Sequence, residues 1–135
     1  MTSIKKYLLD TNICIFYIRG RYNLKTRIEE IGFSNCFISE ITLAELKYGA
    51  EYSEDPQRNN VVIKDFQKEF QIIPIFGAID TYSKEKARLR KLGTLIDDFD
   101  LLIGSTAVSN NLIMVTNNIS HLERIQGITI EDWTR

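Results

Sequence analysis

The side chains most able to do chemistry in this sequence are acids and carboxamides placed beside short apolar runs. They are Asp10, Glu45, Asp100, Asn117 and Asn118. Asp10 directly follows the apolar run 7–9, and the two asparagines directly follow the run 113–116. If these runs are parallel strands, their carboxyl ends meet at one edge of a sheet, where such folds bind ligands. We therefore expect three acids and a pair of carboxamides to converge there.

Three converging carboxylates repel one another unless a cation lies among them. Two such groups about 4 Å apart repel by roughly 4 kcal/mol at an effective dielectric of 20, and each raises the pKa of the others. A cluster of oxygen ligands rich in acids selects Mg²⁺ or Mn²⁺. The single histidine and the separated Cys14 and Cys36 do not suit a zinc site. Acid-held magnesium without a glycine-rich phosphate loop favours attack of an activated water on a phosphodiester.

Each of these residues also has a purely structural interpretation. Asp10 could simply shape a turn and cap a helix, and Asn12 could also cap a helix that runs towards residue 19. Glu45 stands three residues after Thr42, which is the spacing of a capping box. The acids of segment 97–100 crowd a helix start, where negative charge is favoured, and asparagines after a strand often form turns. No single residue decides between the interpretations, whereas their joint placement favours a site.

The elements that must position these residues alternate between short strands and longer helices. This alternation favours an α/β fold with a short, mostly parallel central sheet flanked by helices. The expected strands are 7–9, 36–39, 72–75, 113–116 and, most weakly, 128–130. The expected helices are 12–19, 24–31, 42–49, 58–70, 79–92 and 99–110. Pro74 within the third strand suggests an edge position or an end of pairing.

Composition sets the class of protein but not its function. The 135 residues fit a single domain, 1–135. Hydrophobic residues make up 44% and the formal net charge is −1, so the overall composition does not indicate a nucleic-acid binder. No apolar run approaches the roughly 20 residues that span a membrane. We expect a cytoplasmic protein, because the N-terminal apolar run is too short for a signal peptide and both cysteines lie in apolar stretches.

Five segments resemble the motifs of one known family, the VapC-type PIN-domain toxins. They are LLDTN (8–12), ITLAELKYG (41–49), DDFDLLIG (97–104), VTNN (115–118) and IEDW (130–133). Their order and spacing agree with the family along essentially the whole chain. The resemblance implies a PIN fold and a magnesium-dependent endoribonuclease that hydrolyses RNA. It also implies a toxin that is restrained by a cognate antitoxin protein and that forms a homodimer.

The resemblance also assigns roles by position. Asp10 and Asp100 match the two principal metal ligands of the family, and Glu45 matches its third acid. These three residues would hold Mg²⁺, or Mn²⁺, directly or through water. The metal would then activate a water and neutralise charge on the phosphate, while Glu45 accepts a proton. Replacement of Asp10 or Asp100 by Asn is expected to abolish cleavage without unfolding the protein.

The fourth position of the family site departs from the pattern. The family often has an acid soon after the last core strand, where this chain has Asn118. Asparagine lacks the charge, so a second metal would bind more weakly, and Asp97 or Asp98 are alternatives for this position. The predicted catalytic residues are therefore Asp10, Glu45, Asp100 and Asn118. Asn12 matches a family position that orients the first aspartate.

Basic and aromatic residues indicate where RNA and a partner would bind. Lys84, Arg88 and Lys91 fall at helical spacing and would form one positive stripe, although a run this short is often only a solvated face. Arg19 and Arg21 are other candidates for RNA contacts. The residues near the early helices, which form the antitoxin groove in the family, include Tyr22, Leu24, Phe33, Tyr48 and Tyr52. Core packing would explain their apolar character equally well.

Two other functions stay open at this stage. The first is a catalytically weakened PIN module that binds RNA or a protein partner without cutting, which the asparagine at position 118 favours. The second is a phosphatase that forms an aspartyl phosphate on Asp10, but that chemistry needs a second acid two residues later, where this chain has Asn12. The residues leave open whether transfer, ribosomal or messenger RNA is cut.

Overall fold

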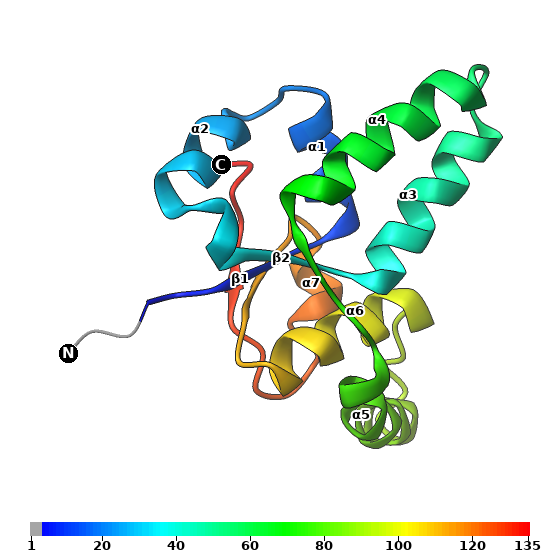
Figure 1. Cartoon of the computed structure of the whole chain (residues 1–135). Coiled ribbons are helices and arrows are strands. Elements are labelled where there is room, and N and C mark those ends of the chain that lie inside the picture. The colour runs from blue at the N-terminus through cyan, green and yellow to red at the C-terminus, as the bar shows by residue number, and fades with distance from the viewer. Residues whose placement is uncertain (1–3) are drawn as a thin grey trace.

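The structure is a computed structural model that describes residues 4–135, and it is an α/β fold with one five-stranded sheet (Figure 1). The strands are β1 (Tyr7–Leu9), β2 (Cys36–Ser39), β3 (Gln71–Ile73), β4 (Ile113–Val115) and β5 (Ile130–Glu131). Their order is β3-β2-β1-β4-β5 and every pair is parallel. The order reverses between β1 and β4, and the carboxyl ends at such a switch point form the usual binding crevice of open α/β sheets.

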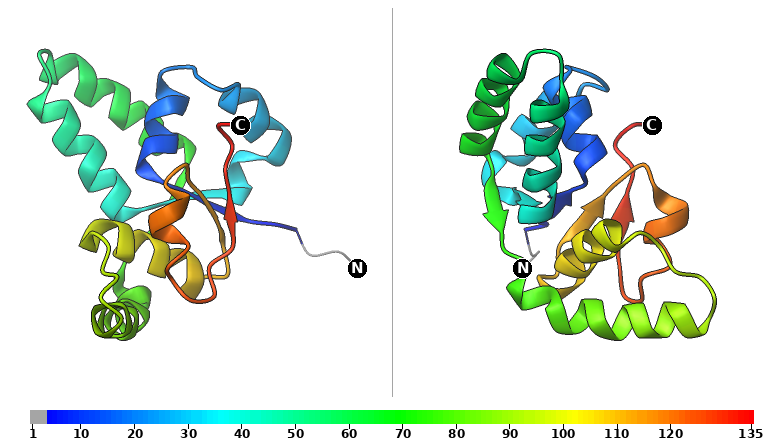
Figure 2. Two further views of the ribbon diagram at one scale, coloured as in Figure 1. Left: turned by 180° about the vertical axis from the view of Figure 1, so that it is seen from behind. Right: turned by 90° about the vertical axis from the view of Figure 1, so that its right-hand side faces the viewer.

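Helices cover both faces of this sheet. They are α1 (Thr11–Ile18), α2 (Leu24–Ile31), α3 (Glu40–Tyr52), α4 (Pro56–Glu69), α5 (Ile79–Lys91), α6 (Asp98–Ser109) and α7 (Ile119–Leu122), with short 3-10 turns η1 (Phe33–Asn35) and η2 (Phe76–Ala78). The first four helices lie on one face, and α5, α6 and α7 lie on the other (Figure 2). None of the helices within residues 4–135 has the length and apolar character needed to cross a membrane.

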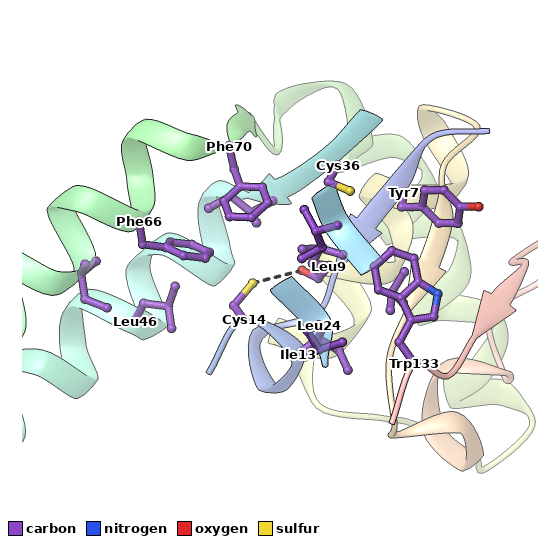
Figure 3. Close-up of a cluster of buried hydrophobic side chains, with 14 of the residues drawn as sticks. Tyr7, Leu9, Ile13, Cys14, Leu24, Cys36, Leu46, Phe66, Phe70 and Trp133 are labelled. Atoms are coloured by element: carbon purple, nitrogen blue, oxygen red, sulfur yellow. Dashed lines mark hydrogen bonds between the residues drawn. The ribbon is translucent and has the colours of Figure 1, made fainter. Parts of the chain in front are cut away.

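The central strands are buried on both faces, as their uninterrupted apolar sequence predicts. Successive side chains of a strand point to opposite faces. In β1, Tyr7 and Leu9 therefore join the cluster beneath α1–α4, while Leu8 joins the cluster beneath α5–α7. The first cluster also contains Trp133, whose ring centroid lies 5.1 Å from that of Tyr7 (Figure 3). The C-terminal segment thus closes this core.

Two helix starts differ from the prediction because strands run into helices without an intervening loop. Asp10, directly after β1, caps α1 by accepting a hydrogen bond from the Thr11 amide at 2.9 Å. The interpretation of Asp10 as a cap is confirmed, and the prediction that Asn12 is the cap is wrong, since Asn12 lies inside the helix. Ser39, the last residue of β2, caps α3 instead of Thr42.

The remaining elements follow the predicted pattern with shifted ends. β3 is an edge strand and its pairing ends just before Pro74, as the proline predicted, although the strand was expected to reach residue 75. The helix expected at 58–70 begins at Pro56, where Asp55 accepts a hydrogen bond from the Arg58 amide at 3.2 Å. The last strand was predicted at 128–130 and begins only at Ile130, because it pairs with Met114 from there on. The helix α7 and both 3-10 turns were not predicted, since each is too short to show a period.

Candidate active site

The carboxyl edge of the sheet gathers the predicted acids from four separate segments. Asp10 follows β1, Glu45 lies in the second turn of α3, and Asp100 lies in the first turn of α6. Asn118 follows β4 and places its amide nitrogen Nδ2 3.4 Å from Asp100 Oδ2. The negative charge of Asp10 contributes to raising the pKa of both Glu45 and Asp100. The structure therefore places the four predicted residues in one site.

Asp10 is the most enclosed of these acids. Only 4% of the residue is exposed, and this burial raises the pKa of its carboxyl group, although two hydrogen bonds oppose the rise. The Thr11 amide donates to Oδ1 at 2.9 Å, and the Thr116 hydroxyl donates to Oδ2 at 2.7 Å. The Thr116 hydroxyl oxygen in turn accepts a hydrogen bond from the backbone amide of Asn118 at 2.9 Å. Both carboxylate oxygens of Asp10 are thus held in place by hydrogen bonds within the chain.

Glu45 is held by the first residue of α1. The Thr11 hydroxyl lies 2.7 Å from Glu45 Oε1 and 3.1 Å from the Thr42 hydroxyl. Because a hydroxyl has one proton, Thr11 donates it to the carboxylate and accepts the hydrogen bond of Thr42. The pKa of Glu45 is raised by burial and further by the charges of Asp10 and Asp97. The capping-box interpretation of Glu45 is wrong, since this side chain binds Thr11 across the site.

Burial and neighbouring like charges act together on the carboxyl group of Asp100. Its pKa is raised to about 6, first by burial and then by the charges of Asp10, Asp97 and Glu45, while His121 partly opposes the rise. The side-chain nitrogen Nδ2 of Asn118, which contacts Asp100, also lies 3.3 Å from His121 Nδ1. Negative charge therefore accumulates around Asp100 with little positive charge to offset it.

The site has the chemistry, though not the closed geometry, of a metal site. Carboxylate oxygens dominate its donors, and these bind hard cations such as Mg²⁺. The acids are close enough to shift one another's pKa. Within residues 4–135, however, no three His, Cys, Asp or Glu side chains are gathered closely enough to bind one ion as they stand. The residues fit a hard divalent ion held partly through water.

The two alternative acids for the fourth position differ in the structure. Asp98 Oδ1 accepts hydrogen bonds from Lys86 Nζ and from the Tyr82 hydroxyl, both at 2.9 Å, so it faces α5. The suggestion that Asp98 supplies the fourth position is therefore wrong. Asp97 caps α6 by accepting a hydrogen bond from the Phe99 amide at 3.0 Å, and its charge also raises the pKa of Asp100.

Threonine and histidine side chains complete the site, and sequence reasoning missed them. The role of orienting Asp10 was assigned to Asn12, but Asn12 is exposed and the side chain that holds Asp10 is Thr116. The available signal was that Thr116 directly follows β4, the strand that pairs with β1. His121 follows Asn118 by three residues, which is one turn of helix, and this spacing could have indicated their contact.

The predicted basic stripe on α5 is interrupted. Arg88 forms an ion pair with Glu85, and its Nη2 donates to the Arg124 carbonyl at 2.7 Å. This side chain therefore ties α5 to the segment before β5 and does not join the outer face. Lys84 and Lys91 are exposed, so only two residues of the predicted stripe remain available to RNA phosphates.

An open groove begins at Glu45 and runs between α1, α3 and α4, with a volume of about 270 Å³. The described residues that line it are Ile15, Ile18, Arg19, Glu45, Leu46, Gly49, Ala50, Ser53, Asn59, Val62 and Ile63. They include none of the five residues proposed from the sequence for a partner groove. Of those, Leu24 is only 1% exposed and belongs to the core. Tyr48 and Tyr52 are exposed but project from α3 outside the groove.

Comparison with known proteins identifies the family to which this fold belongs. The family described as PIN domain matches residues 7–127. The chain belongs to the PIN-domain family. A VapC from Salmonella typhimurium named tRNA(fMet)-specific endonuclease is 42% identical and aligns with 95% of this chain and 98% of its own length. Ribonuclease VapC2 from Haemophilus influenzae is 41% identical with the same coverage of both chains.

Solved structures of PIN-domain proteins lead to the same family. The VapBC complex of Salmonella typhimurium bound to DNA contains a chain that superposes with a TM-score of 0.88 at 39% identity and covers 96% of this chain and 98% of that one. VapBC2 of Rickettsia felis gives a TM-score of 0.86 at 33% identity, covering 94% of this chain and 98% of that one. This PIN domain is therefore a VapC-type ribonuclease fold, and nucleases of this family depend on a metal ion.

Proposed function

We propose that this PIN-domain protein is a magnesium-dependent endoribonuclease that acts as the toxin of a toxin–antitoxin pair. The observation that carries the proposal is the convergence of Asp10, Glu45 and Asp100 at the switch point of the sheet, where each has a raised pKa. Clustered acids with raised pKa values are typical of functional sites. The VapC relatives, named ribonucleases or endonucleases, support hydrolysis of RNA.

The three acids would hold Mg²⁺, or Mn²⁺ in its place, and Asn118 would add a neutral oxygen ligand or a hydrogen bond. When bound, such an ion lowers the pKa of a coordinated water and offsets the charge that develops on a phosphate. Asp10 is oriented for this by Thr11 and Thr116. Asparagine at position 118 leaves one charge fewer than four acids would, which favours tight binding of one ion over two.

The remaining chemistry falls to the chain's own side chains. Glu45 accepts the proton of the attacking water, because its raised pKa suits a general base better than that of an ordinary glutamate. The Thr11 hydroxyl at 2.7 Å holds this carboxylate in one orientation. His121, which contacts Asn118, would donate a hydrogen bond to the phosphate or to the departing oxygen. The water oxygen would form a bond to phosphorus as the bond from phosphorus to the departing sugar oxygen breaks, and that oxygen would take a proton from solvent.

For the biological partners, the relatives point to tRNA and to an antitoxin. The Salmonella typhimurium and Shigella flexneri relatives are named tRNA(fMet)-specific endonucleases, which makes tRNA(fMet) the first substrate to test. The solved VapBC complexes favour a cognate antitoxin for this chain, with the groove between α1, α3 and α4 as its site. An RNA substrate and two buried free thiols favour action in the cytoplasm. A homodimer stays a prediction.

The test compares Asp10→Asn, Glu45→Gln and Asp100→Asn with the unaltered chain in cleavage of purified tRNA, with and without EDTA. Each variant is expected to lose at least about 100-fold in rate, since each removes a metal ligand or the base. Asp98→Asn is the matched control, because Asp98 lies in the same helix turn but faces Lys86. Cleavage by the wild-type protein in EDTA would contradict the proposal. Cleavage by Asp100→Asn at the wild-type rate would also contradict it.

The weakened PIN module remains the second candidate because position 118 is asparagine. It predicts that the wild-type chain binds tRNA, but that no divalent ion produces cleavage. Replacement of Asn118 by Asp would then restore a fourth charge and create magnesium-dependent cleavage. Cleavage by the unaltered chain in magnesium would eliminate this candidate.

A further inference from the structure

Two tyrosines of α3 are much more exposed than large aromatic side chains usually are. Tyr48 is 68% exposed and Tyr52 is 81% exposed. Their ring centroids lie 6.0 Å apart and their planes differ by 15°, so the rings stack on each other. Such a pair contributes little to a hydrophobic core, and clustered apolar surface of this kind usually marks an interaction site.

This pair continues directly from the acidic site. Glu45, Tyr48 and Tyr52 stand at positions i, i+3 and i+7 of α3, which places them in one stripe along the helix. At the rise of an α-helix, Tyr48 lies about 4.5 Å and Tyr52 about 10.5 Å beyond Glu45 along the axis. Anything that binds at Glu45 and extends along α3 therefore meets the two rings.

The tyrosines lie on a different side of α3 from the groove. Leu46 and Ala50 face the groove and are buried in the same cluster as Phe66 of α4. Tyr48 and Tyr52 are not among the described residues that line it. A helical partner in the groove would thus leave the rings uncovered, so the stripe calls for a different occupant.

Charge near Glu45 favours RNA as that occupant. Arg19, at the end of α1, lines the groove together with Glu45. No ion pair within residues 4–135 involves Arg19. A cation that can reach phosphates and aromatic rings that can stack on bases therefore flank the same acid. Proteins that bind single-stranded nucleic acid combine these two features.

We propose that Tyr48 and Tyr52 stack against unpaired bases of the substrate RNA next to the scissile phosphate, an inference that rests on the nuclease function proposed above. With bases about 3.4 Å apart along a strand, the two rings would meet bases roughly one to three nucleotides from that phosphate. Bases within a double helix have covered faces and cannot stack on these rings. The stripe thus selects single-stranded or looped RNA with little sequence preference at these positions.

The experiment measures KM and kcat in magnesium for a single-stranded RNA oligonucleotide of mixed sequence and for the same strand annealed to its complement. The double variant Tyr48→Leu/Tyr52→Leu removes the rings, and Tyr48→Phe/Tyr52→Phe keeps them. The leucine variant is expected to raise KM for the single strand roughly 5- to 100-fold with little change in kcat. The phenylalanine variant is expected to behave like the wild type. Both positions are exposed, so thermal unfolding should be nearly unchanged in either variant.

A second substrate tests the contact itself. Abasic sites within three nucleotides of the cleaved bond are expected to raise KM for the wild type but not to raise it further for the leucine variant. Equal KM values for all three proteins would overturn the inference while leaving the nuclease function intact. Loss of antitoxin binding, or of a dimer, in the leucine variant with unchanged KM would likewise overturn it. If the wild type cleaves no RNA, the proposed function fails, and oligonucleotide binding in Ca²⁺ still tests whether the rings bind RNA.

Discussion

At the scale of single residues, the site is defined by how its carboxylates are held. The two oxygens of Asp10 accept hydrogen bonds from Thr11 and Thr116, whereas among residues 4–135 only Asn118 contacts the Asp100 carboxylate, at 3.4 Å. Asp100 is therefore the acid whose charge is least compensated, and its pKa reaches about 6. An acid in this state costs stability at neutral pH until a cation binds beside it.

This cost predicts how the stability of the metal-free protein depends on pH. The pKa of Asp100 is above the 3.8 of an ordinary aspartate, so between these values the folded state binds more protons than the unfolded state. Unfolding free energy should therefore fall as pH rises from about 4 to about 7. After allowance for partial exposure, the contribution of Asp100 is about 1–2 kcal/mol.

Denaturant unfolding in EDTA measures this effect. Asp100→Asn should be more stable than the wild type at pH 7, and the gain should vanish near pH 4, where both proteins are neutral at this position. Added Mg²⁺ should stabilise the wild type more than the variant. Asp98→Asn is the control, because the Lys86 ion pair lowers the pKa of Asp98 and its removal gives no such gain. A pH-independent difference between Asp100→Asn and wild type would contradict the assignment.

Thr116 offers a second prediction at this scale. Thr116→Val removes the hydroxyl that donates to Asp10 at 2.7 Å and leaves a buried carboxylate oxygen without that partner. The expected cost is about 1–3 kcal/mol of stability at neutral pH. The pKa of Asp10 should rise further, so the acid limb of the rate profile should move to higher pH. Thr116→Ser, which keeps the hydroxyl, should retain the wild-type profile.

At the scale of elements, the site depends on how closely α6 approaches its neighbours, because α6 carries Asp100. Gly104 of this helix faces the segment after β4. A Cβ atom at position 104 would collide with Ile125 Cδ1 and come within 3.0 Å of Leu122 Cδ1. A larger residue at position 104 therefore requires the buried tip of the Ile125 side chain to move.

Two glycine-to-alanine substitutions distinguish this packing restriction from the general preference of helices for alanine over glycine. Gly104→Ala should destabilise the protein by about 1–3 kcal/mol, because the packing must shift. Gly49→Ala in α3 should stabilise it by up to about 1 kcal/mol, because a Cβ there meets nothing within 4 Å. Thermal unfolding in the same buffer gives both values. Equal effects of the two substitutions would show that packing at α6 is not limiting.

At the scale of the whole molecule, two binding surfaces meet at Glu45. The groove between α1, α3 and α4 has apolar walls suited to a partner helix, and the tyrosine stripe lies outside it on α3. A partner in the groove would cover Arg19 and the approach to Glu45. Binding of an antitoxin there would therefore also restrain cleavage.

Substitutions at two adjacent valines of α4 distinguish binding in the groove from a general effect of added surface charge. Val62 lines the groove and is 37% exposed, whereas Val61 is 57% exposed and does not line it. Val62→Asp should weaken binding of the antitoxin encoded beside this protein at least about 10-fold, since it places a charge in an apolar contact. Val61→Asp should bind normally, and both variants should cleave RNA at the wild-type rate. Isothermal titration and the tRNA assay provide the two readouts, and equal binding by both variants would move the antitoxin site elsewhere.

Local patterns in the sequence determined the parallel sheet, the order of most elements and the chain positions of Asp10, Glu45 and Asp100. These are consequences of apolar periodicity and of acids that follow strands, which are visible within a few residues. The motifs also indicated the PIN-domain family, which the comparisons confirm.

Only the tertiary structure decided which side chains hold these acids and which face away. Thr116 contacts Asp10 from 106 residues away in the chain. Arg88 turns inward to Glu85, and Asp98 turns towards Lys86, whereas the charge of the adjacent Asp97 raises the pKa of Asp100. Such choices depend on the register between strands and on the angle at which helices cross. Both are set by packing between distant segments, so no local period in the sequence records them.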